Sequence, residues 1–235
     1  MSFWKQLRDK KKPFFAVAPM ADVTDCAFRA LITKYGKPDV MWTEFVSANG
    51  LMSGGREILS RDLAYSETER PIVAQLFSAD PNTMEGASKL CAELGFDGID
   101  INMGCPDKTI EKQGAGAAMI KDPQRALEVI RAAKRGIASA GRDIPVSVKT
   151  RVGYNQVQLD EWIPLLLVEG VAALTVHART RKDHSLVPAN WEYIKQVVAI
   201  RDKLAPDTVI IGNGDVTSLA DGRAKAGMSG ADGVM

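Results

Sequence analysis

The sequence predicts a TIM (β/α)8 barrel, and three observations support this fold class. The chain has 235 residues, which suits a single barrel or one α/β domain. Strand-like and helix-like segments alternate along it, a pattern typical of parallel strands joined by right-handed crossovers. Eight strand segments can be distinguished, and eight such units close into a barrel of about 250 residues.

The predicted strands are short apolar runs bounded by Gly, Pro or polar residues. They cover residues 14–20, 40–46, 71–77, 98–103, 145–150, 173–177, 208–211 and 231–235. The strand at 98–103 must end before Pro106, because proline has no backbone donor for a strand ladder. The last run reaches the end of the sequence, so we expect a barrel truncated in or just after its eighth strand.

The helices between these strands begin at recognisable caps. Thr24 or Asp25 can cap a helix that reaches Lys34, and Asp-Pro pairs open two more, covering 80–94 and 122–134. Further helices are predicted at 159–169, at 190–203 and from Thr217. An open, doubly wound sheet is the alternative. No strand is followed by Gly-x-Gly-x-x-Gly at a helix start, which weakens the dinucleotide-binding version of that fold.

Composition places the chain among ordinary globular proteins, with 46% hydrophobic and 25% charged residues. No apolar run is long enough for a membrane span, and the basic lead at 1–12 lacks the apolar core of a signal peptide. Three cysteines suggest neither a disulfide framework nor a zinc site, so we expect a cytoplasmic protein without a metal. The net charge of +1 means that any basic footprint for RNA is local.

Polar residues gather where the predicted strands end. Parallel strands bring their carboxyl ends to one rim of a barrel, where active sites lie. We therefore expect a functional site there, built from Gln75, Asn102, Cys105, Lys149, Arg151, His177, Arg179, Asn213 and Asp215.

Three of these residues carry most of the chemistry. Cys105 lies between Gly104 and Pro106 at a strand end, whereas Cys26 and Cys91 fall in helix patterns and are interpreted as packing residues. A free thiol has a pKa of ~8.5 and is protonated near neutrality, so Cys105 suits a proton donor better than a nucleophile. Lys149 follows β-branched residues, which favours an anion or cofactor partner over a snorkelling role, and His177 precedes a basic segment.

Two glycine-containing segments bear on ligand binding. Gly212-Asn213-Gly214-Asp215 could be a simple turn, but phosphate sites of barrels lie after the seventh and eighth strands. A phosphate site there, with Lys149 pointing inward and the amide of Gln75 able both to donate and to accept hydrogen bonds, suits a flavin mononucleotide. The segment at 114–117 is expected to be a plain flexible loop, or a mobile rim segment near Cys105.

The chain resembles the tRNA-dihydrouridine synthases in several short motifs, which occur in family order. They are Ala-Pro-Met-Ala-Asp-Val-Thr-Asp at 18–25 with Phe28-Arg29, Gln-Leu-Phe at 75–77, Asp-Ile-Asn-Met-Gly-Cys-Pro at 100–106 with Gly-Ala-Gly at 114–116, Val-Lys-Thr-Arg at 148–151, Val-His-Ala-Arg-Thr-Arg at 176–181 with 188–191, and Gly-Asn-Gly-Asp at 212–215. Each motif is weak alone, but together they are specific and span nearly the whole chain.

The resemblance implies an FMN-dependent enzyme that reduces a uridine of tRNA to 5,6-dihydrouridine. NADPH or NADH would reduce the flavin, a hydride would pass from flavin N5 to uracil C6, and Cys105 would protonate C5. Asn102 and Arg179 would hold a uracil flipped out of its stack. The flavin-binding residues implied by the resemblance are Pro19, Met20, Ala21, Gln75, Lys149, His177, Asn213, Gly214 and Asp215.

The resemblance also implies what the sequence does not contain. Residues 13–235 correspond to the FMN-binding barrel, whereas the family's Gly-Arg phosphate clamp and helical tRNA-binding domain would lie beyond Met235. We therefore expect this chain to bind FMN weakly and tRNA poorly. The expected partner is a tRNA substrate, with no membrane, and the chain is expected to be monomeric.

Three alternatives remain open at this point. One is another FMN barrel that acts on a small pyrimidine, similar to dihydroorotate dehydrogenases. A second is an aldolase-like barrel in which Lys149 forms a Schiff base. The third is a non-catalytic RNA-binding scaffold, for which Cys105 would have no chemical role.

Overall fold

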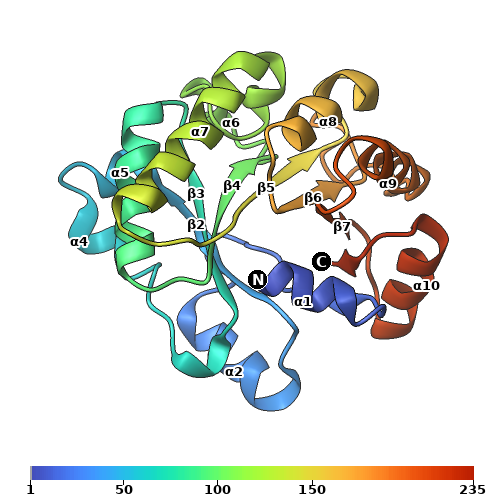
Figure 1. Cartoon of the computed structure of the whole chain (residues 1–235), viewed down its shortest axis with the longest axis horizontal. Coiled ribbons are helices and arrows are strands. Elements are labelled where there is room, and N and C mark those ends of the chain that lie inside the picture. The colour runs from blue at the N-terminus through green and yellow to red at the C-terminus, as the bar shows by residue number, and fades with distance from the viewer. Residues whose placement is uncertain (1) are drawn as a thin grey trace.

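The structure, a computed structural model that describes residues 2–235, is a ring of eight parallel strands with helices around its outside (Figure 1). Neighbouring strands follow the order β1-β8-β7-β6-β5-β4-β3-β2, and the isolated bridge between Ala16 and Val40 brings β1 against β2. The predicted (β/α)8 barrel is confirmed. The strands are β1 (Phe14–Phe15), β2 (Met41–Ser47), β3 (Ile72–Phe77), β4 (Gly98–Met103), β5 (Val146–Arg151), β6 (Ala173–His177), β7 (Val209–Asn213) and β8 (Gly233–Val234).

The helices pack on the outer face of the ring, apart from α1, which lies across one of its ends (Figure 1). None of the helices in residues 2–235 is long and apolar enough to cross a membrane. The helices are α1 (Phe3–Asp9), α2 (Cys26–Gly36), α3 (Ala48–Leu51), α4 (Arg56–Leu59), α5 (Pro81–Glu93), α6 (Lys108–Lys112), α7 (Pro123–Ser139), α8 (Leu159–Val168), α9 (Glu192–Leu204) and α10 (Leu219–Ser229), with 3-10 turns η1 (Glu67–Glu69) and η2 (Gly116–Lys121).

Two hydrophobic cores hold the barrel together. The larger core lies between the ring and the outer helices, and includes Ile101 of β4 and Ile130 of α7. The smaller core lies inside the ring, where Trp4 and Leu7 of α1 pack with residues such as Trp42. Because successive side chains of a strand point to opposite faces, β2, β3, β6 and β7 contribute to both cores, whereas the apolar residues of β4 and β5 belong to the larger core alone.

The inside of the ring changes character along the barrel axis. Val73, Ala173 and Val209, near the amino ends of their strands, belong to the inner apolar core. Further along the same inward-facing rows come polar side chains, which include Gln75, Asp100, Asn102, Ser147, Lys149, Thr175, His177 and Asn213. The apolar end beside α1 is therefore suited to stability, and the carboxyl end to chemistry.

Two segments are more ordered than the sequence-based expectation. Residues 3–9, within the stretch predicted as a polar lead, form α1, whose side chains Trp4 and Leu7 are buried and whose start is capped by Ser2. The segment 114–117 is not a plain flexible loop, because Ala115 is buried and Gly116 begins the buried 3-10 helix η2. Both segments gain their order from tertiary packing, which local composition does not show.

Candidate active site

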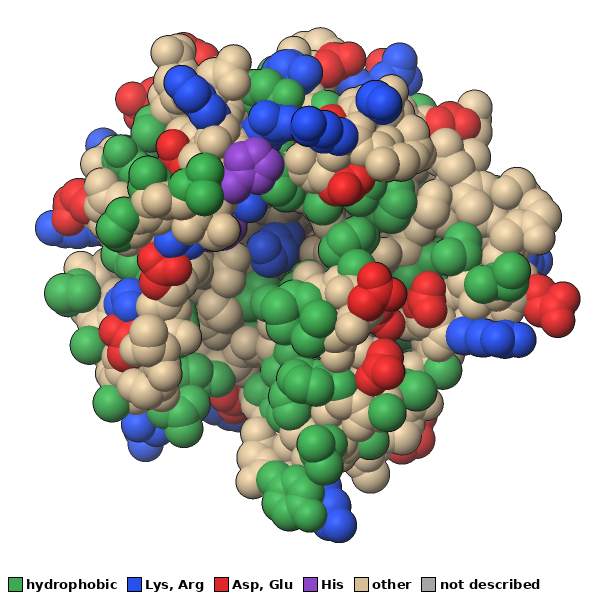
Figure 2. Space-filling model, turned by 180° about the vertical axis from the view of Figure 1, so that it is seen from behind, with side chains coloured by type: hydrophobic (Ala, Val, Ile, Leu, Met, Phe, Trp, Pro, Cys, Tyr) green, Lys and Arg blue, Asp and Glu red, His purple; other side chains and the backbone are tan. Residues whose placement is uncertain are grey.

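The carboxyl end of the ring brings the predicted site residues together. Cross-strand register pairs Asn102 of β4 with Lys149 of β5, and His177 of β6 with Asn213 of β7. Figure 2 views the face opposite to α1 and shows a central hollow with a basic side chain on its floor and a histidine at its edge. The predicted convergence of strand ends is therefore present in the structure.

Lys149 supplies a half-buried positive charge to this hollow. Its Nζ lies 3.2 Å from Oδ1 of Asn213, whose Nδ2 donates to the carbonyl of Met235 at 2.9 Å. Burial, with a smaller contribution from Arg151, lowers the pKa of Lys149 to about 8. No carboxylate in residues 2–235 forms an ion pair with Lys149, so its charge is available to an anionic or electron-rich ligand.

His177 is held as a neutral imidazole. Its Nε2 lies 3.1 Å from Nη1 of Arg179, and a guanidinium can only donate, so Nε2 accepts and the proton is on Nδ1. Burial, followed by the nearby charge of Lys149, lowers the pKa of His177 to about 2. The ring therefore offers one N–H donor and no charge.

Arg179, which is buried, and Asp215, which is exposed, connect the loops that follow β6 and β7. Nη2 of Arg179 donates to both carboxylate oxygens of Asp215, at 2.7 and 2.6 Å, and Nε donates to the carbonyl of Val187. The Asp215 carboxylate also accepts from the backbone N–H of Ala189 at 2.8 Å. In this structure both side chains hold loops in place, and the expected contact of Arg179 with a substrate stays a prediction.

The turn after β7 borders a pocket of about 580 Å³, which also contacts the segment after β1 and the start of α10. Gly214 has a φ of +124°, and a Cβ atom on it would lie 2.8 Å from Cβ of Ala189 and 3.0 Å from Cδ2 of His177. The carboxylate of Asp215 turns away from the pocket to Arg179. The backbone of the turn and the N-terminus of α10 therefore line the pocket, an arrangement that favours a phosphate.

Cys105 lies on the loop after β4 and is partly buried. Its backbone N–H donates to Oδ1 of Asn102 at 2.9 Å, and its carbonyl accepts from the N–H of Ala117 at the same distance. Burial is the largest cause of a raised pKa for the Cys105 thiol. The thiol is therefore protonated at neutral pH, as a proton donor must be.

The remaining predicted residues fall in two places. Gln75 is fully buried inside the ring, where it bonds Asp100 and Asn102. Pro19, Met20 and Ala21 follow β1 on the rim, where Pro19 is buried and Met20 is 40% exposed. The N–H of Met20 donates to Oγ1 of Thr24 at 3.0 Å, which fixes this turn.

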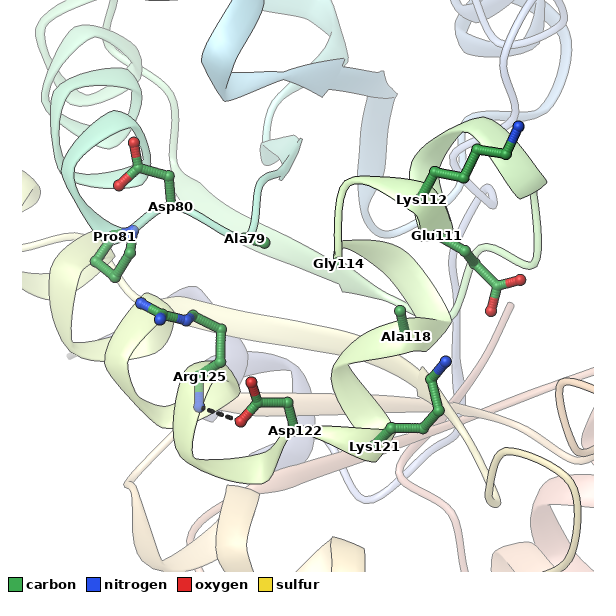
Figure 3. A pocket seen from close by; sticks show the side chains of 10 residues that line it. All are labelled: Ala79, Asp80, Pro81, Glu111, Lys112, Gly114, Ala118, Lys121, Asp122 and Arg125. Carbon is green, nitrogen blue, oxygen red and sulfur yellow. Dashed lines mark hydrogen bonds between the residues drawn. The ribbon is translucent and has the colours of Figure 1, made fainter.

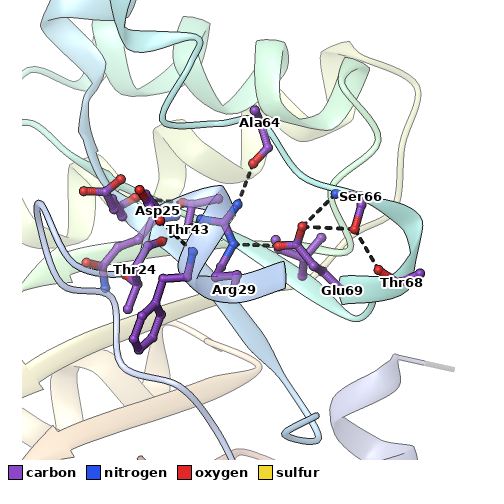
Figure 4. A network of polar contacts seen from close by, with 12 residues as sticks. Thr24, Asp25, Arg29, Thr43, Ala64, Ser66, Thr68 and Glu69 are labelled. Atoms are coloured by element: carbon purple, nitrogen blue, oxygen red, sulfur yellow. Dashed lines mark hydrogen bonds and ion pairs between the residues drawn. The ribbon is translucent and has the colours of Figure 1, made fainter. Parts of the chain in front are cut away.

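A buried ion pair anchors that turn from behind (Figure 4). Arg29 of α2 is fully buried, and its Nε donates to Oε2 of Glu69 at 2.6 Å while its Nη1 donates to the carbonyl of Thr24 at 2.7 Å. Arg29 also bonds the carbonyl of Ala64. The role of Arg29 in this motif is therefore structural, because its bond to Thr24 supports the turn that carries residues 19–21.

Two residues of the site were not assigned roles from the sequence. Arg151 donates from Nε to the carbonyl of Gly104 at 2.7 Å and from Nη1 to that of Thr180 at 3.0 Å, so it joins two rim loops. Its spacing of two from Lys149, which puts both on one face of β5, was the available signal. The second such residue is Asp100. A carboxylate within the apolar run of β4 was the sequence feature that could have pointed to it.

A second pocket of about 650 Å³ lies at the outer edge of the same rim, between the start of α5, α6, η2 and the start of α7 (Figure 3). Its charged side chains are balanced, and one of the acids, Asp122, accepts from the N–H of Arg125 at 3.1 Å to cap α7. None of the predicted site residues lines this pocket. The charged residues that line it are Asp80, Glu111, Lys112, Lys121, Asp122 and Arg125.

An eight-stranded parallel barrel with a lysine, a thiol and a pocket-lining glycine turn at its carboxyl rim has the architecture of the (β/α)8 enzymes, whose ligand sites lie at that rim. A family model described as dihydrouridine synthase matches residues 16–235. The chain belongs to the dihydrouridine synthase family.

Similar proteins agree with this assignment. The chain is 41% identical over 236 residues to "Probable tRNA-dihydrouridine synthase 2" of Bacillus subtilis (strain 168). The alignment covers 100% of this chain and 70% of that relative. It is 39% identical over 237 residues to "Probable tRNA-dihydrouridine synthase" of Staphylococcus aureus (strain COL), covering 69% of the latter.

Similar solved structures support the fold alone, because their sequences are distant. DHODH from Eimeria tenella, crystallised with ferulenol, has a TM-score of 0.64 and 12% identity, over 94% of this chain and 74% of that one. Orotidine 5'-phosphate decarboxylase from Lactobacillus acidophilus has a TM-score of 0.54 and 13% identity, over 95% and 88% of the two chains.

Proposed function

We propose that this chain reduces the C5–C6 double bond of a uridine in tRNA, with FMN and NADPH (or NADH) as cofactors and Cys105 as the proton donor. The observation that carries the proposal is the half-buried thiol of Cys105, whose pKa is raised by burial, at the same rim as Lys149 and the β7 pocket. Membership of the dihydrouridine synthase family supports the reaction class.

The residues at the rim fit a flavin mononucleotide. The turn after β7 and the N-terminus of α10 offer backbone donors to a phosphate, and Lys149 offers a cation to the electron-rich edge of the flavin ring. Bound FMN would supply the hydride chemistry. We assign FMN binding to Pro19, Met20, Ala21, Gln75, Lys149, His177, Asn213, Gly214 and Asp215.

The reaction balances with two electrons and two protons added to the pyrimidine. NADPH is oxidised, C6 receives a hydride and C5 receives a proton from Sγ of Cys105, which solvent then reprotonates. Asn102 and Arg179 are our candidates for holding the uracil, which must leave its base stack to reach the hollow. Neutral His177 keeps its Nδ1–H free to donate without adding charge beside Lys149.

The experiment is a cysteine comparison with the chain, FMN, NADPH and tRNA that lacks dihydrouridine, read by mass spectrometry of the tRNA. Cys105→Ala should lower dihydrouridine formation by at least ~10²-fold, the usual scale for a lost general acid, while flavin absorbance bound to the chain is retained. Cys26→Ala, a change of an exposed thiol, is the matched control and should react like the parent.

Other outcomes would favour the alternatives. Full activity of Cys105→Ala would defeat the proposed proton donor. Reduction of a free small pyrimidine with none of tRNA would indicate a reaction like that of dihydroorotate dehydrogenases. Trapping of a carbonyl substrate on Lys149 by borohydride would indicate Schiff-base chemistry instead.

A further inference from the structure

A buried carboxylate inside the ring has no place in the proposed reaction. Asp100 of β4 is 0% exposed, and it lies in register with Gln75 of β3 and Ser147 of β5. Its Oδ2 accepts from Nε2 of Gln75 at 2.7 Å, and its Oδ1 accepts from Oγ of Ser147 at 2.6 Å. A carboxylate is costly to bury, and these two bonds compensate only part of that cost.

The bond to Gln75 begins a directed series that leads to the rim. An ionised carboxylate can only accept, so Gln75 must turn its NH2 group to Asp100 and its Oε1 away from it. That Oε1 accepts from Nδ2 of Asn102 at 3.1 Å. Asn102 must then present Oδ1 to the loop, where it accepts from the N–H groups of Gly104 at 3.1 Å and Cys105 at 2.9 Å.

The same loop is held from its carbonyl side by other groups. The carbonyl of Gly104 accepts from Arg151, and the carbonyl of Cys105 accepts from the N–H of Ala117. The N–H side depends on Asn102 alone among the side chains described in residues 2–235. The orientation of that one amide therefore decides whether the loop is fixed on both sides.

We propose that Asp100 is a positioning residue for Cys105: its carboxylate sets the orientation of the Gln75 and Asn102 amides, and Asn102 thereby fixes the backbone that carries the thiol. The role of the thiol itself rests on the proposed function. The positioning of the loop does not rest on it, because the loop has this geometry whether or not the chain catalyses a reaction.

The three cysteines provide an internally controlled measurement. Each is alkylated with iodoacetamide at pH 8 in the cofactor-free chain and quantified by peptide mass spectrometry. Cys105 reports on the loop, exposed Cys26 is the reference, and fully buried Cys91 reacts only when the barrel opens. If the parent chain formed no dihydrouridine, the proposed function would fail, but the comparison of cysteine alkylation rates would still test the positioning role of Asp100.

Asp100→Asn is the first variant, because it keeps the shape of the side chain and lets it donate as well as accept. Gln75 can then flip, which sets its NH2 group against that of Asn102. Cys105 should be alkylated about tenfold faster, the change expected for one lost network hydrogen bond, with Cys26 unchanged and Cys91 unreacted. Ser147→Ala, which leaves the series toward Cys105 intact, should keep the parent rate at Cys105.

The double variant Asp100→Asn with Gln75→Glu restores the direction of the series, because the introduced carboxylate can accept from both neighbouring amides. It should return the Cys105 rate to within about twofold of the parent. A parent-like Cys105 rate in Asp100→Asn, with Cys91 still protected, would overturn the proposal. Fast alkylation of Cys105 in the double variant, with Cys91 still protected, would also overturn it. So would alkylation of Cys91 in both the single and the double variant, since Asp100 would then serve only the barrel's stability.

Discussion

At the scale of single residues, the site is a set of side chains whose pKa values are shifted by burial. Lys149 remains a cation with a pKa lowered to about 8, and His177 remains neutral with its pKa lowered to about 2. The two effects are linked, because the charge of Lys149 is one cause of the low pKa of His177. Arg151 and Arg179 contribute in the same direction, so several cations gather around the neutral histidine.

The neutral state of His177 predicts a loss of stability in acid. An unfolded histidine titrates near 6.5, whereas the folded one stays unprotonated well below that value, so stability is complete above pH 6.5 and falls as the pH decreases. From pH 7 to pH 5 this residue should cost about 2 kcal/mol in unfolding free energy. His177→Gln, which keeps an acceptor for Arg179, should lack that loss in urea titrations at the two pH values.

The matched control for this experiment is His184→Gln, since His184 lies in an exposed loop. A pH-dependent difference of the same size in the control, or none between the parent and His177→Gln, would contradict the assignment to His177.

The candidate site could be predicted from sequence as far as its main residue types and strand positions. Lys149, His177 and Asn213 stood out because polar residues at the ends of apolar strands must converge in a barrel. The engagement of Arg179 by Asp215 and the role of Arg151 could not be predicted, because they depend on loop conformations. Sequence position shows that a side chain is near the rim, but not which of its neighbours it bonds.

At the scale of elements, helices α5 and α7 show how closely the outer layer packs. Gly136 of α7 faces α5, and a Cβ atom on it would lie 2.1 Å from the carbonyl oxygen of Glu85. Neither helix could approach so closely with a larger residue at that position. Gly136 is therefore required by packing, although glycine disfavours helix formation in isolation.

Two glycine substitutions separate packing from helix propensity. Gly136→Ala should destabilise the fold by about 1–3 kcal/mol, because overpacking outweighs the gain in propensity. Gly227→Ala in α10, where nothing lies within 4 Å of the added Cβ, should stabilise it by about 0.5–1 kcal/mol. Urea unfolding measures both, and changes of the same sign would refute the packing argument.

The elements themselves were predictable where their patterns are long or strongly bounded. The strands predicted at 98–103 and 173–177 have the observed bounds of β4 and β6, and Asp25 is the N-cap of α2. Helix α1 was missed, because seven residues carry too little periodicity and its order comes from contact with the barrel. The first strand is shorter than predicted, since only Phe14–Phe15 form a ladder with β8.

At the scale of the whole molecule, the barrel separates stability from chemistry along its axis. Helix α1 closes the end opposite to the site, where Trp4 is 1% exposed and contacts the rings of Phe14 and Trp42 at centroid distances of 6.0 and 5.7 Å. Changes at that end should affect unfolding more than binding.

Trp4→Ala tests this separation. It should lower the unfolding free energy by about 3–5 kcal/mol through the cavity it leaves, while the rate of Cys105 alkylation in the folded chain stays at the parent value. Lys5→Ala changes the exposed face of the same helix and should alter stability by no more than about 0.5 kcal/mol. Faster Cys105 alkylation in folded Trp4→Ala would show that the two ends are coupled.

The ring's closure also defines its mechanical behaviour. Seven junctions join neighbouring strands in register, whereas β1 and β2 meet at one isolated bridge. The ion pair of Arg29 with Glu69 runs beside this seam, from the helix after β1 to the turn before β3. Under a pulling force or in early denaturation, the molecule should behave as a C-shaped band that opens at this seam, where the restraints are a few backbone hydrogen bonds and one buried ion pair.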